Sequence, residues 1–209
     1  MQKSLEKQIL TKFKKAGRGT LFFAENFHSL GNTKAVNKTL ERLVDKGELL
    51  RVATGIYVRP KKDAVIGIIT PGIEDIAKAI AKRDRARIVP TGIYALNKLG
   101  LSTQVPLNIV YLTDGAARKI KVGKNTITFK KTTPKNVAAV GEISKLAIQA
   151  LRTIGKDNVT KAEIEKIQTL LKKEKPTRLE QDIRLAPVWI KEIMKPVLEN
   201  LTNESKSTQ

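Results

Sequence analysis

The side chains best suited to chemistry in this sequence are cations, amides and hydroxyls between residues 18 and 59. Guanidinium and ammonium groups bind phosphate, a guanidinium also binds the edge of guanine through two hydrogen bonds, and a carboxamide pairs with adenine. The candidate contact residues are Arg18, Thr33, Lys34, Asn37, Lys38, Arg42, Arg51, Thr54, Tyr57 and Arg59. Among them Asn37 suits adenine, and Thr54 suits the minor groove or the phosphate backbone. These side-chain types favour the binding of nucleic acid.

Residue types needed for catalysis or metal binding are scarce. The chain has one histidine, His28, and no cysteine, which excludes disulfides, zinc fingers, iron–sulfur clusters and thiol catalysis. A metal-dependent nuclease would need clustered carboxylates beside a lysine, and Asp114, Lys130 and Lys131 come nearest to that pattern. Residues 126–129 supply no central carboxylate, however, and Asp114 suits a turn. We therefore expect no enzyme, no catalytic residue, no metal and no cofactor.

The net charge points to a polyanionic partner. Forty lysines and arginines against twenty acidic residues give the 209-residue chain a formal charge of +20. Residues 1–62 hold 14 basic and 5 acidic side chains, a net charge of +9, and the other 147 residues have +11. The charge per residue is thus about twice as high in the first part. Nucleic acid is the natural partner of such a surface, with an anionic membrane surface as the second candidate.

The hydropathy pattern gives no sign of a membrane protein. The longest apolar runs are interrupted by Lys, Arg or Gly well before the roughly 18 residues that a membrane span needs. The first seven residues lack the apolar stretch of a signal peptide. We expect a cytoplasmic protein with no membrane partner.

Helical patterns position the first group of candidate residues. Apolar residues recur at four-residue steps in a predicted helix over residues 3–16, and a short strand and a short helix follow before a turn at residues 29–31. The next predicted helix spans Thr33–Lys46, with Asn32 or Thr33 as its N-cap. Its apolar face carries Val36, Leu40, Leu43 and Val44. The opposite face carries Lys34, Lys38 and Arg42, although Glu41 and Asp45 weaken its charge.

A predicted β-hairpin positions the remaining candidates. Residues 49–52 and 56–59 are strand-like, and Ala53–Gly55 forms the loop between them, with glycine where a positive φ is needed. In this register Arg51, Tyr57 and Arg59 face outward. A short helix, a turn, an amphipathic helix and a basic hairpin follow each other in the order of a winged helix-turn-helix, whose second helix enters the major groove. We therefore expect a DNA-binding domain over residues 1–62, ending in a polar linker at residues 60–63.

The rest of the chain predicts an α+β domain. The expected strands cover residues 87–89, 107–112, 118–122 and 126–131, the last two as an antiparallel hairpin. Helices are expected after Thr70, over residues 91–99, over 143–154, after the capping box Thr160–Glu163, and after Pro187. We expect residues 63–201 to form this domain, with a small, mostly antiparallel sheet and C-terminal helices. Residues 202–209 are polar and are expected to be a disordered tail.

Several runs together resemble a known family. They are residues 43–47 at the end of the second helix, residues 55–58 of the hairpin, the long run 90–106, and residues 110–115. These runs are similar to the AbiEi-type antitoxins of bacterial type IV toxin–antitoxin systems, in a short and largely uncharacterised subfamily. The resemblance covers about residues 1–195.

The resemblance implies both an activity and partners. It implies an N-terminal winged helix that represses the protein's own promoter, and a C-terminal domain that supplies antitoxin activity. It also implies a functional link to a nucleotidyltransferase-like toxin encoded next door, without a stable complex between the two proteins. The sequence thus predicts a DNA-binding autoregulator and antitoxin. A winged-helix-targeted, metal-dependent nuclease and a protein-docking module without a specific DNA site remain as alternatives.

Overall fold

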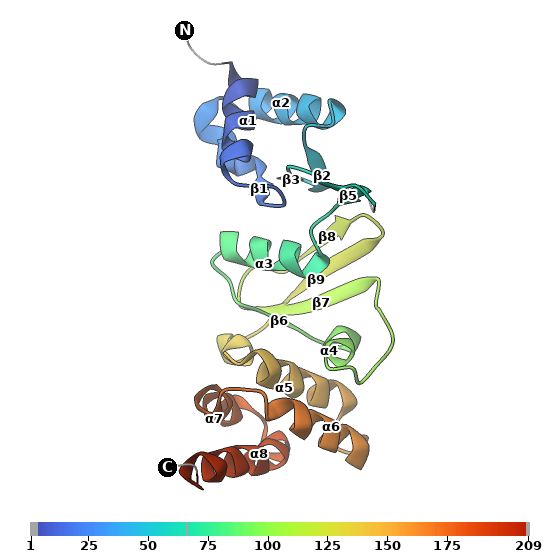
Figure 1. Cartoon of the computed structure of the whole chain (residues 1–209), viewed down its shortest axis with the longest axis vertical. Coiled ribbons are helices and arrows are strands. Elements are labelled where there is room, and N and C mark those ends of the chain that lie inside the picture. Colours follow the sequence, from blue (N-terminus) through green and yellow to red (C-terminus); the bar gives the residue numbers. More distant parts are fainter. Residues whose placement is uncertain (1–3, 66, 208–209) are drawn as a thin grey trace. The chain divides into compact units, whose positions relative to one another are not determined.

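The computed structural model describes residues 4–65 and 67–207. The chain divides into two compact units, which are Met1–Ile80 with Ile120–Thr126, and Ala81–Lys119 with Ile127–Gln209. The structure confirms the α+β class, with small antiparallel sheets and with helices in the C-terminal part (Figure 1). The division at residue 62 and the limits of the following domain stay predictions.

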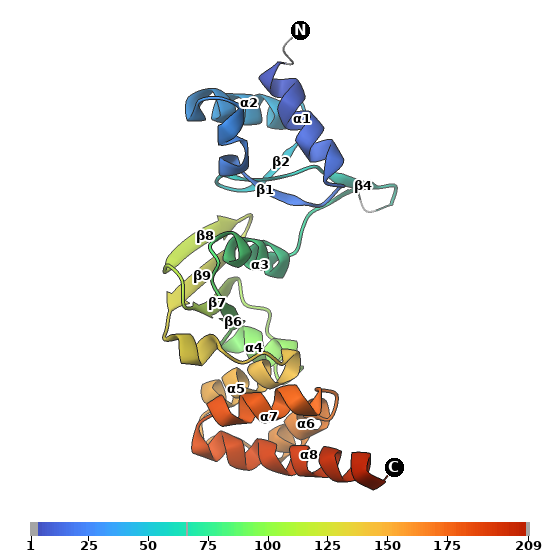
Figure 2. The same cartoon turned by 90° about the vertical axis from the view of Figure 1, so that its left-hand side faces the viewer.

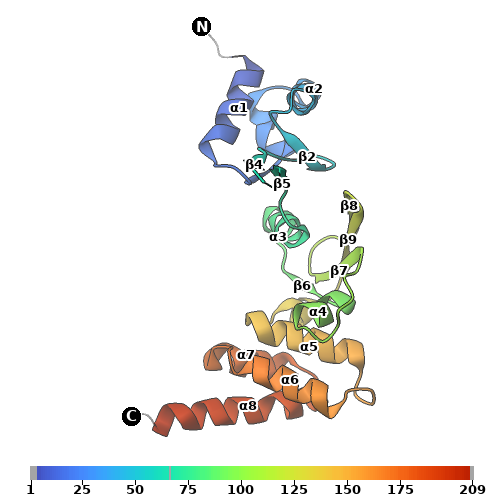
Figure 3. The same cartoon turned by 45° about the vertical axis from the view of Figure 1, so that its right-hand side comes forward.

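The first unit begins with three helices and three strands. They are α1 (Leu5–Lys15), β1 (Leu21–Phe23), the 3₁₀ helix η1 (Ala24–Leu30), α2 (Thr33–Asp45), β2 (Leu50–Ala53) and β3 (Ile56–Val58). Figure 3 shows α2 nearly end-on, with α1 beside it and β2 below it. The helices enclose a core of three aromatic rings from Phe13, Phe22 and Phe27, with ring centroids 4.4 to 5.6 Å apart. The buried face of α2 packs in this core, as its apolar periodicity predicted.

The strand β3 is the centre of the first sheet, and this position corrects the orientation expected for Tyr57. The strand order is β1-β3-β2, with Tyr57 paired to Phe22 on one side and to Arg51 on the other. Tyr57 packs in the hydrophobic core beside its cross-strand partner Phe22, so it is 4% exposed instead of facing solvent. The hairpin loop is also shorter than expected, because Ala53 belongs to β2 and only Thr54 and Gly55 connect the strands.

The predicted polar linker after the first sheet is wrong. Residues Lys61–Asp63 form β4, which pairs antiparallel with β5 (Gly67–Ile69). After β4 the Val65 N–H donates to Asp63 Oδ1 at 2.9 Å, and Gly67 at the start of β5 has a φ of +76°. Ile68 and Ile69 favour a strand in β5. Pro60 and the charged residues of β4 had indicated a linker instead. Helix α3 (Ile73–Arg83) follows, as expected.

A four-stranded sheet is the centre of the second part of the chain. Its strands are β6 (Ile88–Pro90), β7 (Asn108–Thr113), β8 (Arg118–Val122) and β9 (Asn125–Lys131), in the order β6-β7-β9-β8. All four strands lie within about two residues of the predicted ranges. The short helix α4 (Ile93–Lys98) connects β6 to β7, and its Tyr94 ring contacts the buried Tyr111 ring at 6.0 Å. The 3₁₀ helix η2 (Pro134–Val137) follows β9.

Four helices complete the chain. They are α5 (Glu142–Ile154), α6 (Lys161–Leu171), α7 (Pro176–Leu185) and α8 (Val188–Ser207). Figure 2 shows α5, α6 and α7 together over α8, around one apolar core. The capping box at Thr160 and Glu163 is confirmed, but α7 had not been expected. The expected disordered tail is helical as far as Ser207, where α8 ends, and residues 208–209 lie outside the described residues.

No helix in the part of the chain that the structure describes is long and apolar enough to cross a membrane.

Candidate nucleic-acid interface

Helix α2 is fixed in rotation by its cap and its buried face. Asn32 is the N-cap, and its Oδ1 accepts a hydrogen bond from the Ala35 N–H at 2.8 Å. Val36, Leu40 and Leu43 on the opposite face are fully buried. With 3.6 residues per turn, this burial directs residues 34, 38, 41 and 45 to solvent.

The exposed face of α2 has two halves of opposite charge. Thr33, Lys34, Asn37 and Lys38 are all exposed in the N-terminal half, as the sequence predicted. Lys34 and Lys38 make no ion pair or hydrogen bond through their side chains with any described residue. The exposed acidic residues Glu41 and Asp45 follow in the C-terminal half. Phosphate is therefore attracted to the beginning of the helix and repelled from its end.

The basic residues of the last turns of α2 are already engaged within the protein. The Arg42 guanidinium donates to Thr39 Oγ1 at 3.2 Å. Lys46 forms an ion pair with Glu6 of α1, with 2.6 Å between Nζ and Oε1. The hydrogen bond from Lys46 lowers the pKa of the Glu6 carboxyl, and the charges of Lys46 and Arg42 act in the same direction. Arg42, a predicted contact residue, thus has a structural role before any ligand binds.

The hairpin places Arg51 and Thr54 at the surface. Arg51 is exposed on β2 directly opposite Tyr57 on β3, and Thr54 is exposed in the loop, where Gly55 has a φ of +71°. Burial raises the pKa of the Tyr57 hydroxyl, while the charge of Arg51 opposes this rise and that of Glu41 adds to it. Arg51 is thus the cross-strand neighbour of Tyr57, and the charge of Glu41 on α2 acts on the same hydroxyl.

Arg18 and Arg59 form a separate group. Arg18 lies between Gly17 and Gly19, which have φ of +61° and +85°, and the Gly19 N–H donates to the Arg59 carbonyl at 3.3 Å. Arg59 follows the end of β3 that is remote from the Thr54 loop. The structure therefore collects Thr33, Lys34, Asn37 and Lys38 at the start of α2, and sets Arg18 and Arg59 together at the other end of β3.

A family model for a family of unknown function, DUF6088, matches residues 8–179. The chain belongs to the DUF6088 family. Among solved structures, the crystal structure of the RV2827C protein from Mycobacterium tuberculosis is similar, with a TM-score of 0.44 and 10% sequence identity. That similarity covers 93% of this chain and 82% of the other. None of the curated proteins matches the sequence.

The acidic residue considered for metal chemistry in this DUF6088 protein is held by an arginine. Asp114 follows β7, and its carboxylate accepts the Arg87 backbone N–H at 2.7 Å and the Arg87 Nε–H at 2.8 Å. Burial alone would raise the pKa of Asp114, but the hydrogen bonds and charge of Arg87 lower it below the usual range. Among the described residues no group of three or more His, Cys, Asp or Glu side chains could hold a metal ion. His28 is exposed on η1.

Two buried carboxylates escaped the sequence analysis. Asp182 of α7 is fully buried and accepts the backbone N–H groups of Val140 and Gly141, each at 2.8 Å, and the Ser144 hydroxyl. Glu174, 7% exposed, accepts the Ile143 N–H at 2.7 Å. A Cβ at Gly141 would lie 2.7 Å from Glu174 Oε2, so only glycine permits this approach. The partners lie 31 to 42 residues apart in sequence, and no local signal links them.

Proposed function

We propose that residues 1–62 form a winged helix-turn-helix that binds duplex DNA, with the beginning of α2 as the reading element. The observation that carries the proposal is the uncompensated positive charge of Lys34 and Lys38, beside the exposed amide of Asn37. The order α1, β1, η1, α2, β2, β3 supports it, because a short helix, a turn, an amphipathic helix and a hairpin succeed one another.

The charge distribution on α2 defines how the helix would dock. The start of α2 enters the major groove, where Asn37 meets a base edge and the lysines meet phosphate or guanine. Glu41 and Asp45 keep the C-terminal half of the helix away from the phosphates. Arg51 and Thr54 on the hairpin then contact the backbone beside the groove, while Tyr57 supports them from within the sheet.

The proposal extends to the biological role. The runs at residues 90–106 and 110–115 resemble AbiEi-type antitoxins, so we assign the protein the role of a transcriptional autoregulator of its own promoter and an antitoxin. Its toxin would be a nucleotidyltransferase-like protein encoded by a neighbouring gene, countered without a stable complex. The resemblance in sequence is the support for this part.

Fluorescence anisotropy with labelled duplexes tests the DNA-binding part. The protein should bind its own upstream DNA at least tenfold more tightly than a scrambled duplex at moderate salt. Lys34→Gln with Lys38→Gln should weaken binding and reduce the log–log salt slope by about 1.8, since each phosphate contact contributes about 0.9. The matched control is Lys172→Gln with Lys173→Gln, two exposed lysines after α6 without side-chain partners among the described residues. Equal binding to both duplexes would refute the repressor role.

Co-expression tests the antitoxin part. A neighbouring nucleotidyltransferase-like gene should arrest growth when expressed alone and should be tolerated together with this protein. Growth arrest that persists in the presence of the protein would refute the antitoxin role and leave the DNA-binding result untouched.

A further inference from the structure

A small cavity lies in the second unit between α5, η2 and β6. It has a volume of about 10 Å³, and the polar side chains that line it are Lys135, Asn136, Lys145, Gln149 and Arg152. Val89 of β6 and Ile148 of α5 are among the apolar residues of its wall. No acidic residue is among the described residues that line it. The cavity is thus surrounded by groups that mostly donate hydrogen bonds.

Gln149 is the buried polar group of this cavity. Its side chain is 3% exposed, and its carboxamide makes no hydrogen bond with any residue that the structure describes. Buried carboxamides are nearly always satisfied, because an unpaired one loses its hydration without replacement. The amide is not among the fully enclosed, unsatisfied polar atoms of the described residues, so it reaches the cavity and takes its partner, water or a ligand, from outside the chain.

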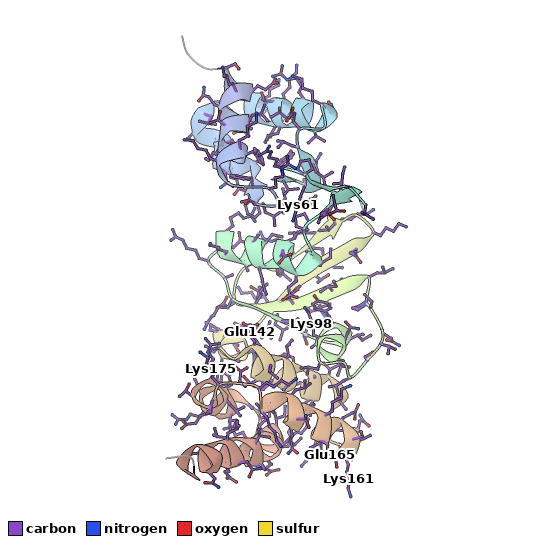
Figure 4. All side chains as sticks on the ribbon, viewed as in Figure 1. Lys61, Lys98, Glu142, Lys161, Glu165 and Lys175 are labelled. Carbon is purple, nitrogen blue, oxygen red and sulfur yellow. The ribbon has the colours of Figure 1, made fainter. Side chains whose placement is uncertain are left out.

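Three cations line the same cavity as Gln149. Lys135 is exposed and its ammonium has no partner among the described residues. The Arg152 guanidinium donates one hydrogen bond to Asn136 Oδ1 at 3.2 Å, and its other N–H groups remain available as donors. The Lys145 ammonium is 2.8 Å from Glu142, which Figure 4 labels at the start of α5, and its side chain is only 18% exposed. The carboxylate of Glu142 thus balances one of the three positive charges that line the cavity.

We propose that this cavity binds one oxyanion of the phosphate class. Its volume suits one water-sized atom, so a single phosphate oxygen enters and accepts from Gln149. The other oxygens remain at the mouth and accept from Lys135 and Arg152, since charge-assisted hydrogen bonds to phosphate are stronger than those to water. The phosphate belongs either to a small molecule or to the backbone of a nucleic acid. The inference does not rest on the proposed role of α2.

Calorimetric titration of the full chain with inorganic phosphate, at low salt, tests the site. Wild type should bind one phosphate per chain. Lys135→Gln and Arg152→Gln should each weaken binding about tenfold, and Gln149→Leu should abolish it while it preserves side-chain volume. Lys131→Gln is the matched control, because Lys131 is exposed and unpaired among the described residues but does not line the cavity. Since Lys135 is exposed, its variant should fold even if Gln149→Leu does not.

A second titration distinguishes the sources of the phosphate. Lys34→Gln with Lys38→Gln provides the background, so that α2 contributes little to any binding of duplex DNA. If adding Lys135→Gln lowers the remaining salt slope by about 0.9, the phosphate is that of a nucleic-acid backbone. If only phosphate and nucleoside monophosphate binding falls, the ligand is a small molecule. Absence of saturable phosphate binding by wild type, or equal binding by Lys135→Gln and Lys131→Gln, would overturn the proposal.

Discussion

Helices α2 and α5 differ in how the positive charge and the free N–H groups at their N-terminal ends are balanced. Each helix start carries a partial positive charge and backbone N–H groups that need acceptors. At α5 the buried carboxylates of Asp182 and Glu174 come from α7 and the turn before it and supply those acceptors. At α2 a single neutral cap, Asn32, is followed by exposed Lys34 and Lys38. An internally neutralised helix start serves packing, whereas one with added positive charge is available to an external anion.

The largest effect is expected when the buried acceptor at the start of α5, the Asp182 carboxylate, is removed. Asp182→Ala leaves two backbone N–H groups and the Ser144 hydroxyl unpaired in the core, and it should lower the free energy of unfolding by about 3 kcal/mol or more. Urea denaturation measures the loss. Asp182→Asn keeps one acceptor oxygen and should lose less. A loss below about 1 kcal/mol in Asp182→Ala would show that α5 does not depend on this carboxylate.

Variants of the two N-cap residues, Asn32 of α2 and Thr160 of α6, distinguish an effect on stability from an effect on DNA binding. Asn32→Ala and Thr160→Ala should each cost about 1 kcal/mol of unfolding free energy, because each removes an acceptor of a helix-start N–H. Only Asn32→Ala should also weaken DNA binding, since it frays the proposed reading helix. Urea denaturation and anisotropy on the same variants provide the comparison. Equal effects of both variants on DNA binding would contradict the assignment of α2.

A smaller effect is expected at the acidic half of α2. Glu41→Gln removes an exposed negative charge from the C-terminal half of α2 and should raise the affinity for scrambled DNA about threefold, as expected for an exposed charge. The affinity for the upstream duplex should change less, so that discrimination between the two falls. Asp157→Gln, at an exposed acid beyond α5, is the control. Unchanged binding of scrambled DNA would contradict the proposal that Glu41 repels the phosphates.

The smallest effect concerns Asp114. Its pKa is lowered in the folded protein, so its carboxylate stabilises the fold above the ordinary value of about 3.9, and this stabilisation is lost as the pH falls through the folded value. Wild type should therefore lose more stability than Asp114→Asn between about pH 6 and pH 3, by less than about 1 kcal/mol. Urea denaturation at both pH values provides the measurement. An identical pH dependence would show that the Arg87 contact contributes nothing in solution.

Elements with strong local signals were predicted well. The helix expected at Thr33–Lys46 spans Thr33–Asp45, and its Asn32 cap is confirmed. The hairpin before Lys131 and the capping box at Thr160 also agree with the structure. Four-residue periodicity, helix caps and glycine turns each depend on a few neighbouring residues, so they can be recognised in the sequence alone. Strand β4 was missed because it consists of charged residues after a proline, and its partner β5 was missed because it has only three residues.

What the sequence determined by itself is the charge of this protein, the absence of cysteine, and the amphipathic helix that carries Lys34, Asn37 and Lys38. Tertiary structure decided which of the predicted residues remain available. It buried Tyr57 against the aromatic core and set Arg18 and Arg59 apart from α2. It also gave α5 its acceptors and Gln149 its unpaired amide. These outcomes depend on contacts between residues distant in sequence, where packing and not local pattern selects the partners.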